Sequence, residues 1–104
     1  MSKNNKHIEF ELVGRAQAGD DKAFEELVQL HDRRILNLAL SMLGNLADAQ
    51  DVYQETFMRA WRGIGSFRHQ SSFTTWLMRI AVNQSLTLRR RRSLHSFFSL
   101  TTII

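Results

Sequence analysis

Apolar residues along the chain recur every three or four positions, which is the spacing of an amphipathic α-helix. They do so in four successive segments, and the strict alternation that predicts β-strands does not persist between them. Proline, which interrupts helices, is absent. The pattern predicts an all-α fold: a compact bundle of three long helices with a short leading helix.

Capping residues mark the expected limits of the first two helices. A short helix is expected over residues 8–18, behind a flexible N-terminus at 1–7. Asp20 and Asp21 offer N-caps for a long second helix, because short acidic side chains accept hydrogen bonds from the free N–H groups of a first turn. That helix should end near Leu43, before a glycine.

The third and fourth helices follow the same logic. Asn45 caps a third helix over residues 47–62, which two nearby glycines then end. Ser71 or Ser72 caps a fourth helix that runs to about Arg91. Buried positions repeat at helical spacing in all four segments, and they are Leu12, Val13, Ala16, Phe24, Leu27, Val28, Ile35, Leu38, Ala39, Met42, Val52, Phe57, Ala60, Trp61, Ile64, Phe73, Trp76, Leu77, Ile80, Ala81 and Leu88.

The last segment, residues 93–104, departs from the helical pattern. It holds no Lys, Arg, Asp or Glu, and it is apolar and partly β-prone. It is too short for another domain, and an exposed segment of this kind promotes aggregation. Three interpretations stay open: packing on the bundle, contact with a partner, or a chain end altered by truncation or frameshift.

Charge is divided unevenly between the two halves of the chain. Residues 1–56 hold six Lys/Arg and ten Asp/Glu, whereas residues 57–104 hold eight Arg and no acidic residue. An acid-free second half is the electrostatic signature of a phosphate-binding surface, and the arginines continue a patterned helix. We therefore favour nucleic acid as the binding partner of this basic segment over the alternative, in which the segment is a solvated basic tail.

Signatures of catalysis and of metal or cofactor binding are missing from the sequence. The four histidines are scattered, and no HExxH motif, placeable Ser/His/Asp set or glycine-rich phosphate loop occurs. The absence of cysteine excludes disulfides and thiolate metal sites, and it fits a reducing cytoplasm. With 104 residues and no apolar run of about 18, we expect one domain that is not an enzyme, takes no cofactor or metal, spans no membrane and is a monomer when free.

Two surfaces are candidates for binding. The first is an acidic face on the third helix with one apolar residue, made of Asp48, Asp51, Gln54, Glu55 and Met58. It suits a basic partner helix, and simple solvation is the equal alternative. The second combines aromatics, arginines and an amide, as single-stranded nucleic-acid sites do. Its members are Phe67, Arg68, His69, Phe73, Trp76, Arg79, Asn83, Arg89, Arg90, Arg91 and Arg92.

Within the second surface, not every aromatic residue is an equal candidate for base contact. The helical spacing of Phe73 and Trp76 favours the core. Phe67 and Asn83 are therefore the better candidates for contacts with bases, and the arginines for contacts with phosphates.

The segment DAQDVYQETFMRAW, followed by FRHQSSFTTWLMRIAVN and four arginines, resembles region 2 of bacterial extracytoplasmic-function (group IV) RNA polymerase sigma factors. The usual family form of the first motif is close to DAEDLVQEVFLRAW. The likeness covers about Glu11 to Arg92, and two adjoining motifs at matching spacing make it specific. It implies a transcription initiation factor domain that binds core RNA polymerase and recognises and melts the promoter −10 element.

The resemblance also implies roles for individual residues and partners. The family's first motif binds the clamp helices of the polymerase β′ subunit, and here it corresponds to the same acidic face together with Phe57. The family's next loop receives a flipped base from the non-template strand of the −10 element. Here that loop comprises Phe67, Arg68, His69, Gln70, Ser71 and Ser72, and the asparagine that contacts the base matches Asn83. An anti-sigma factor is a further implied partner, and the implied location is the bacterial cytoplasm, at the nucleoid.

The chain departs from the family pattern in several places. Gln50 replaces a usual Glu, Met78 a common Tyr and Thr87 a frequent Asp. No segment supplies region 4, the second domain that reads the −35 element. The chain would then be an isolated domain, a truncated product or a sigma-like protein that works without region 4, and this absence favours a sigma-like module that binds polymerase or an anti-sigma factor without initiating transcription. A general helical nucleic-acid binder is a further alternative, which the resemblance disfavours.

Overall fold

The computed structural model describes residues 2–103, with side chains described from residue 6 to residue 100. This span holds four α-helices, one short 3₁₀ turn and no strand. In chain order the elements are α1 (Ser2–Gln17), α2 (Asp21–Leu43), α3 (Leu46–Gly63), η1 (Ile64–Ser66) and α4 (Phe73–Ile103). The expected all-α fold is confirmed.

The helices begin at side-chain caps, as expected. The Ala23 N–H donates to the Asp20 carboxylate over 3.2 Å, and the Asp48 N–H donates to the Asn45 side chain over 2.8 Å. At the start of α4, the Thr75 N–H donates to Ser72 Oγ over 3.0 Å. Each cap satisfies an N–H group that has no partner inside its helix, so short local signals set these boundaries.

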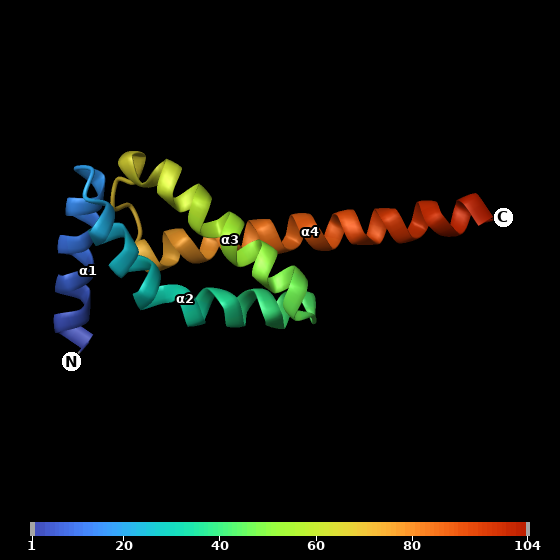
Figure 1. The fold of residues 1–104 in the computed structure, drawn as a ribbon, viewed down its shortest axis with the longest axis horizontal. Helices are drawn as coiled ribbons and strands as arrows, with labels where there is room; N and C mark the ends of the chain where they lie inside the picture. The colour runs from blue at the N-terminus through green and yellow to red at the C-terminus, as the bar shows by residue number, and fades with distance from the viewer. Residues whose placement is uncertain (1, 104) are drawn as a thin grey trace.

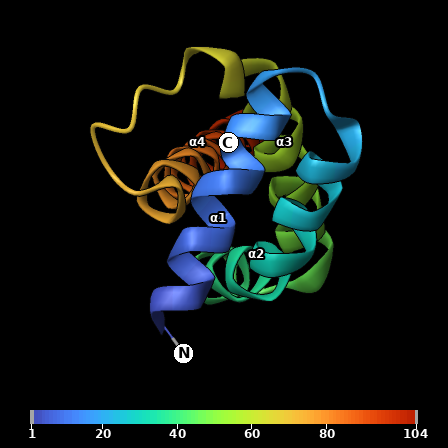
Figure 2. The same ribbon diagram turned by 90° about the vertical axis from the view of Figure 1, so that its left-hand side faces the viewer.

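The helix α2 turns into α3 through a tight connection at Gly44, whose φ of 78° is a left-handed conformation that favours glycine. α2 and α3 thereby form a hairpin, and α4 packs against both helices of it (Figure 1). α1 contacts α2 and η1 and lies across the end of the other helices, in front in Figure 2. The yellow loop between η1 and α4 runs along one side of this end (Figure 2).

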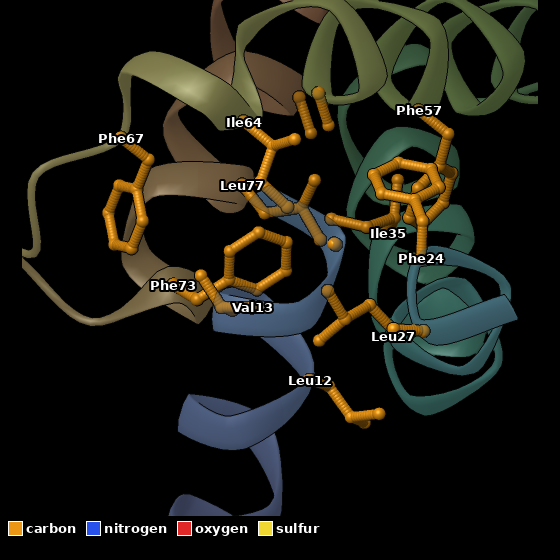
Figure 3. Close-up of a cluster of buried hydrophobic side chains, with 14 residues drawn as sticks. Leu12, Val13, Phe24, Leu27, Ile35, Phe57, Ile64, Phe67, Phe73 and Leu77 are labelled. Carbon is orange, nitrogen blue, oxygen red and sulfur yellow. The ribbon is translucent and has the colours of Figure 1, made fainter. Parts of the chain in front are cut away.

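One main core lies where all four helices meet. Val13, Leu27, Ile35 and Leu77 are almost completely buried, with one from α1, two from α2 and one from α4. Figure 3 shows the core between two aromatic groups, with Phe67 and Phe73 on the side of the loop and Phe24 and Phe57 opposite. Burying each large apolar side chain stabilises the fold by about 1.5–3 kcal/mol relative to exposure.

A smaller core cluster joins α2 and α3 near their connection. Ala39, Ala49 and Val52 are buried there, and Leu88 of α4 packs against them. Most of the positions predicted to be buried are buried or half-buried. The exception is Trp61, whose side chain keeps 47% of its surface exposed. Its helical spacing suits the core and its ring contacts Phe24 of α2 with centroids 5.0 Å apart, but about half of its surface stays open to solvent.

Two predicted helix ends were wrong. α1 begins at Ser2 rather than at residue 8, so the N-terminal residues expected to be flexible are helical from Ser2 onward. α4 continues to Ile103, twelve residues beyond the expected end. No glycine or proline follows Gly65, so the sequence holds no strong signal to stop the helix.

The C-terminal half of α4 extends past the other helices, as the orange-to-red helix in Figure 1 shows. This projection makes the molecule 58 Å long but only 27 by 23 Å across. The four helices therefore form a compact bundle around the main core, as expected. The C-terminal half of α4 projects from this bundle as a single helix. Every described side chain from residue 89 onward is exposed.

Candidate protein and nucleic-acid interfaces

The outward face of α3 carries most of the acidic surface expected from the sequence. Asp51, Gln54 and Met58 are exposed and lie three or four residues apart, which places them on one side of the helix. Glu55 is half-buried and forms an ion pair with Arg59 over 3.0 Å. Two carboxylates and an amide thus face solvent next to a flexible apolar side chain.

Asp48 does not belong to that exposed face, which corrects the expectation. Only 8% of its surface is exposed, because its carboxylate accepts hydrogen bonds from Asn45 Nδ2, over 2.9 Å, and from Arg92 Nη2. The hydrogen bond from Asn45, and then the contact with Arg92, lower the pKa of Asp48 below its usual value. Asp48 is therefore a structural anion at the junction of α3 and α4.

Phe57 is buried, as its helical spacing predicts, so it does not lie on the exposed α3 face with which the family resemblance grouped it. It packs on Tyr53 with ring centroids 4.9 Å apart and forms the floor of a shallow apolar depression of about 360 Å³. Met58 and Trp61 form its rim, and both are about half exposed. Sequence reasoning placed Trp61 in the core, although its position seven residues after Gln54 is also a signal for the outward face.

Phe67 anchors the loop between η1 and α4 instead of presenting its ring for base contact. It is 6% exposed and packs on Phe73 and Trp76, with centroid distances of 5.9 and 5.1 Å. Gln17 of α1 holds the same segment, because its Nε2 donates to the carbonyls of Ile64 and Phe67 over 3.0 and 2.8 Å. No motif in the sequence pointed to this role of Gln17.

The rest of the loop faces solvent. Arg68, His69, Gln70 and Ser72 are exposed, and Ser71 is half-buried. His69 has a φ of 57°, a left-handed conformation that is unfavourable for a residue with a Cβ atom. Phe67 packs beneath the loop on Phe73 and Trp76, while the polar side chains of the loop remain exposed above it.

The exposed polar residues of α4 continue the surface of the loop. Arg79, Asn83 and Arg90 are exposed and lie four and seven residues apart, which places them along one side of the helix. Arg89 and Arg91 are exposed beside them. Arg92 is exposed as well, but its guanidinium is paired with the Asp48 carboxylate.

A buried polar cluster lies behind the loop and was not expected from the sequence. Glu9 of α1 accepts a hydrogen bond from Thr74 Oγ1 over 3.0 Å, and its carboxylate lies 2.7 Å from His31 Nε2. Burial lowers the pKa of His31, and the neighbouring Glu9 opposes that effect only in part. The cluster connects α1, α2 and the first turn of α4.

Within the described residues, no group of three or more His, Cys, Asp or Glu side chains is arranged to hold a metal ion. A separate property concerns membranes: none of the helices in the described part of the chain is long and apolar enough to cross one.

The fold is a small helical domain with two contrasting faces, an acidic and apolar surface on α3 and a basic surface on the loop and α4. The sequence model of the family described as Sigma-70 region 2 matches residues 18–95. The chain therefore belongs to the Sigma-70 region 2 family, and the resemblance seen in its motifs is confirmed. The match begins after α1, so that helix lies outside it.

Curated relatives support the same assignment. The RNA polymerase sigma-H factor of Pseudomonas aeruginosa is 45% identical over 85 residues, which cover 79% of this chain and 44% of the relative. The ECF RNA polymerase sigma factor SigW of Bacillus subtilis is 38% identical over 80 residues, which cover 77% of this chain and 43% of the relative. The chain thus spans less than half the length of these relatives.

Two solved structures resemble the fold. An engineered region 2 of sigmaE, determined by NMR in complex with GTAAAA, has a TM-score of 0.75 and 36% identity, covering 82% of this chain and 88% of that one. CnrH in complex with the cytosolic domain of CnrY has a TM-score of 0.72 and 31% identity, covering 77% of this chain and 52% of that one.

Proposed function

We propose that this domain docks on core RNA polymerase through the outward face of α3 and binds the non-template strand of a promoter −10 element through the loop and α4. It would act in the bacterial cytoplasm, at the nucleoid, as the part of a sigma factor that recognises and melts the −10 element. The observation that carries the proposal is the separation of the two surfaces: acidic and apolar on α3, basic on α4, within a Sigma-70 region 2 domain.

Electrostatics support the division of roles. Asp51 and Glu55 offer negative charge to a basic partner helix, and exposed charges of opposite sign raise the rate of association. Residues 57–104 hold eight arginines and no acid, so the surface of α4 attracts phosphates without internal competition from its own helix. The complex of a related region 2 with GTAAAA supports nucleic acid as the ligand of this side.

Phe67 contributes to this function by holding the loop, not by stacking on a base. The exposed residues that remain for contact with a flipped base are Arg68, His69 and Gln70 in the loop and Asn83 in α4. An asparagine side chain both donates and accepts hydrogen bonds, so it can read the edge of a base. Extrusion of a base costs a few kcal/mol, which a rigid loop and phosphate contacts together offset.

The polymerase-docking half is tested by the binding of this chain to a purified fragment containing the β′ clamp helices. Asp51→Lys and Glu55→Lys should abolish binding that is micromolar or tighter in the wild type. Glu25→Lys changes the charge equally on the exposed side of α2 and should leave binding unchanged. Equal binding by all four proteins would refute docking through α3.

A second candidate is a module that binds polymerase or an anti-sigma factor without initiating transcription. The complex between CnrH and the cytosolic domain of CnrY favours a protein partner for a domain of this fold. Transcription from a −10 promoter, reconstituted with core polymerase and this chain, separates the two functions. Transcripts above the core-only background indicate an initiation factor, whereas core binding without transcripts indicates the module.

A further inference from the structure

A groove of about 670 Å³ lies on the side of the loop that faces α1 and α2. Its walls come from three separate segments, with Lys6 and Phe10 on α1, Arg34 on α2, and His69 in the loop. This volume falls within the roughly 300–1,000 Å³ of typical small-ligand sites. Asn83 does not line this groove but His69 does, so the groove adjoins the surface proposed above to contact the flipped base and shares His69 with it.

An aromatic column forms one wall of the groove. The ring of His69 lies between Phe67, at a centroid distance of 4.6 Å, and Phe10, at 5.0 Å. Phe67 is buried and belongs to the core, whereas Phe10 at the outer end of the column keeps 63% of its surface exposed. The left-handed backbone of His69 presents its ring to Phe10. The column therefore ends in an aromatic surface that is rigidly supported and open to solvent.

The charges around the groove favour an anion. Lys6 and Arg34 line it, and neither forms an ion pair with the side chains that the structure describes. Its one carboxylate, Glu9, is directed inward and engaged by Thr74 and His31. Hydroxyl groups of Ser72 and Thr75 lie along the side of α4.

We infer that this groove binds a second nucleotide of the single strand, adjacent to the one held by the loop and Asn83. Its base stacks on Phe10, and Lys6 and Arg34 contact its phosphate. An exposed aromatic ring next to unpaired cations is the arrangement that binds single-stranded nucleic acid without reading its sequence. The loop borders both surfaces, so one strand can pass from one to the other. The inference rests on the proposed function, and it adds α1, which precedes the family match, to the nucleic-acid surface.

Binding of the intact chain to single-stranded DNA tests the inference. The probe is GTAAAA extended by two nucleotides at each end, together with versions that carry one abasic position each. Phe10→Ala should weaken binding of the full probe about fivefold to tenfold, because stacking contributes roughly 1–3 kcal/mol per base and His69 keeps part of the contact. Ile8→Ala, which truncates another exposed apolar side chain on the same helix, should have no effect.

The abasic probes identify the nucleotide in the groove. At one position, the abasic probe should bind the wild type more weakly than the full probe does. The Phe10→Ala variant should bind that abasic probe and the full probe equally, since the two changes remove the same contact. If the loss of binding free energy from Phe10→Ala simply adds to the loss from the abasic site at every probe position, the inference is wrong. Arg34→Gln should reduce the slope of log affinity against log salt by about 0.7, as expected for one phosphate contact on a single strand, whereas Arg33→Gln should not.

The controls separate failure of the inference from failure of the proposed function. If Asn83→Ala weakens binding of the probe but Phe10→Ala, like Ile8→Ala, does not, the surface proposed for the −10 element is supported. The groove is then not a nucleotide site. If the wild type binds none of the probes, both are wrong. Circular dichroism at the binding temperature shows that each variant is as helical as the wild type, and Phe10 is exposed enough for its removal to leave the core intact.

Discussion

The guanidinium of Arg92 pairs with the carboxylate of Asp48, which joins the end of the basic run on α4 to the first turn of α3. The two residues are 44 positions apart in the chain. Asn45 and Arg92 together lower the pKa of Asp48, so it is ionised at neutral pH. The pair withdraws one positive charge from the surface that we propose for DNA and one negative charge from the surface that we propose for polymerase.

Release of Arg92 from this pair should add a phosphate contact. In Asp48→Asn the guanidinium loses its anionic partner, so the slope of log affinity for single-stranded DNA against log salt should steepen by about 0.7. Asp51→Asn changes the net charge equally but releases no arginine, so its slope should match that of the wild type. Fluorescence anisotropy titrations between low and high salt measure the slopes. Equal slopes for the two variants would show that Arg92 already contacts phosphate or cannot reach it.

Loss of the Gln17 amide should loosen the loop. Its Nε2 donates to two carbonyls, at the first residue of η1 and at the start of the loop, and each such hydrogen bond stabilises the fold by about 0.5–1.5 kcal/mol. Gln17→Glu keeps the shape but turns an acceptor toward those carbonyls, so urea unfolding should show a loss of roughly 1–3 kcal/mol. Gln29→Glu, at an exposed position of α2, should change stability by less than about 0.5 kcal/mol. A Gln17→Glu protein as stable as Gln29→Glu would contradict the role of the amide.

His31 should make the fold less stable in mild acid. Burial lowers its pKa in the folded state below the usual 6.5, so the unfolded chain binds a proton more readily than the folded one. The contribution of His31 to the free energy of unfolding therefore increases with pH up to about 6.5. Above that pH it is constant. His31→Gln should lose this part of the pH dependence between about pH 5 and 7, measured by chemical unfolding at each pH. His7→Gln removes an exposed histidine and should keep the pH dependence of stability seen in the wild type. If His31→Gln also keeps that pH dependence, another group must cause it.

Ser85 carries a buried hydroxyl that has no hydrogen-bond partner among the described residues. Ser85→Ala removes this unsatisfied group and replaces it with the best helix former, so the free energy of unfolding should rise by about 1–2 kcal/mol. Ser93→Ala, at an exposed position of the same helix, gains only helix propensity and should rise by about 0.5 kcal/mol or less. Urea or thermal unfolding of the two variants compares them directly. A smaller gain for Ser85→Ala than for Ser93→Ala would indicate that a water molecule bonds the buried hydroxyl.

The sequence by itself determined the helices, most of their ends and the family. Caps such as Asp20, Asn45 and Ser72 act through hydrogen bonds to residues three positions away, so they are visible in a short stretch of sequence. The motifs that identify the family lie within one continuous stretch, from Asp48 to Arg92. Even the length of α4, which was predicted wrongly, follows from a local property, the absence of a stop signal after Gly65.

Only the tertiary structure decided which of the candidate residues face solvent. Phe67 is buried because Phe73 and Trp76 fold back against it, and Asp48 is covered because α4 is long enough to bring Arg92 to it. Trp61 stays about half exposed, although its ring packs on Phe24 of α2. These outcomes depend on contacts between different elements of the fold, and helical periodicity describes one helix at a time. The groove beside Phe10 arises in the same way, because three separate segments form its walls. The sequence of any one of these segments does not predict the groove.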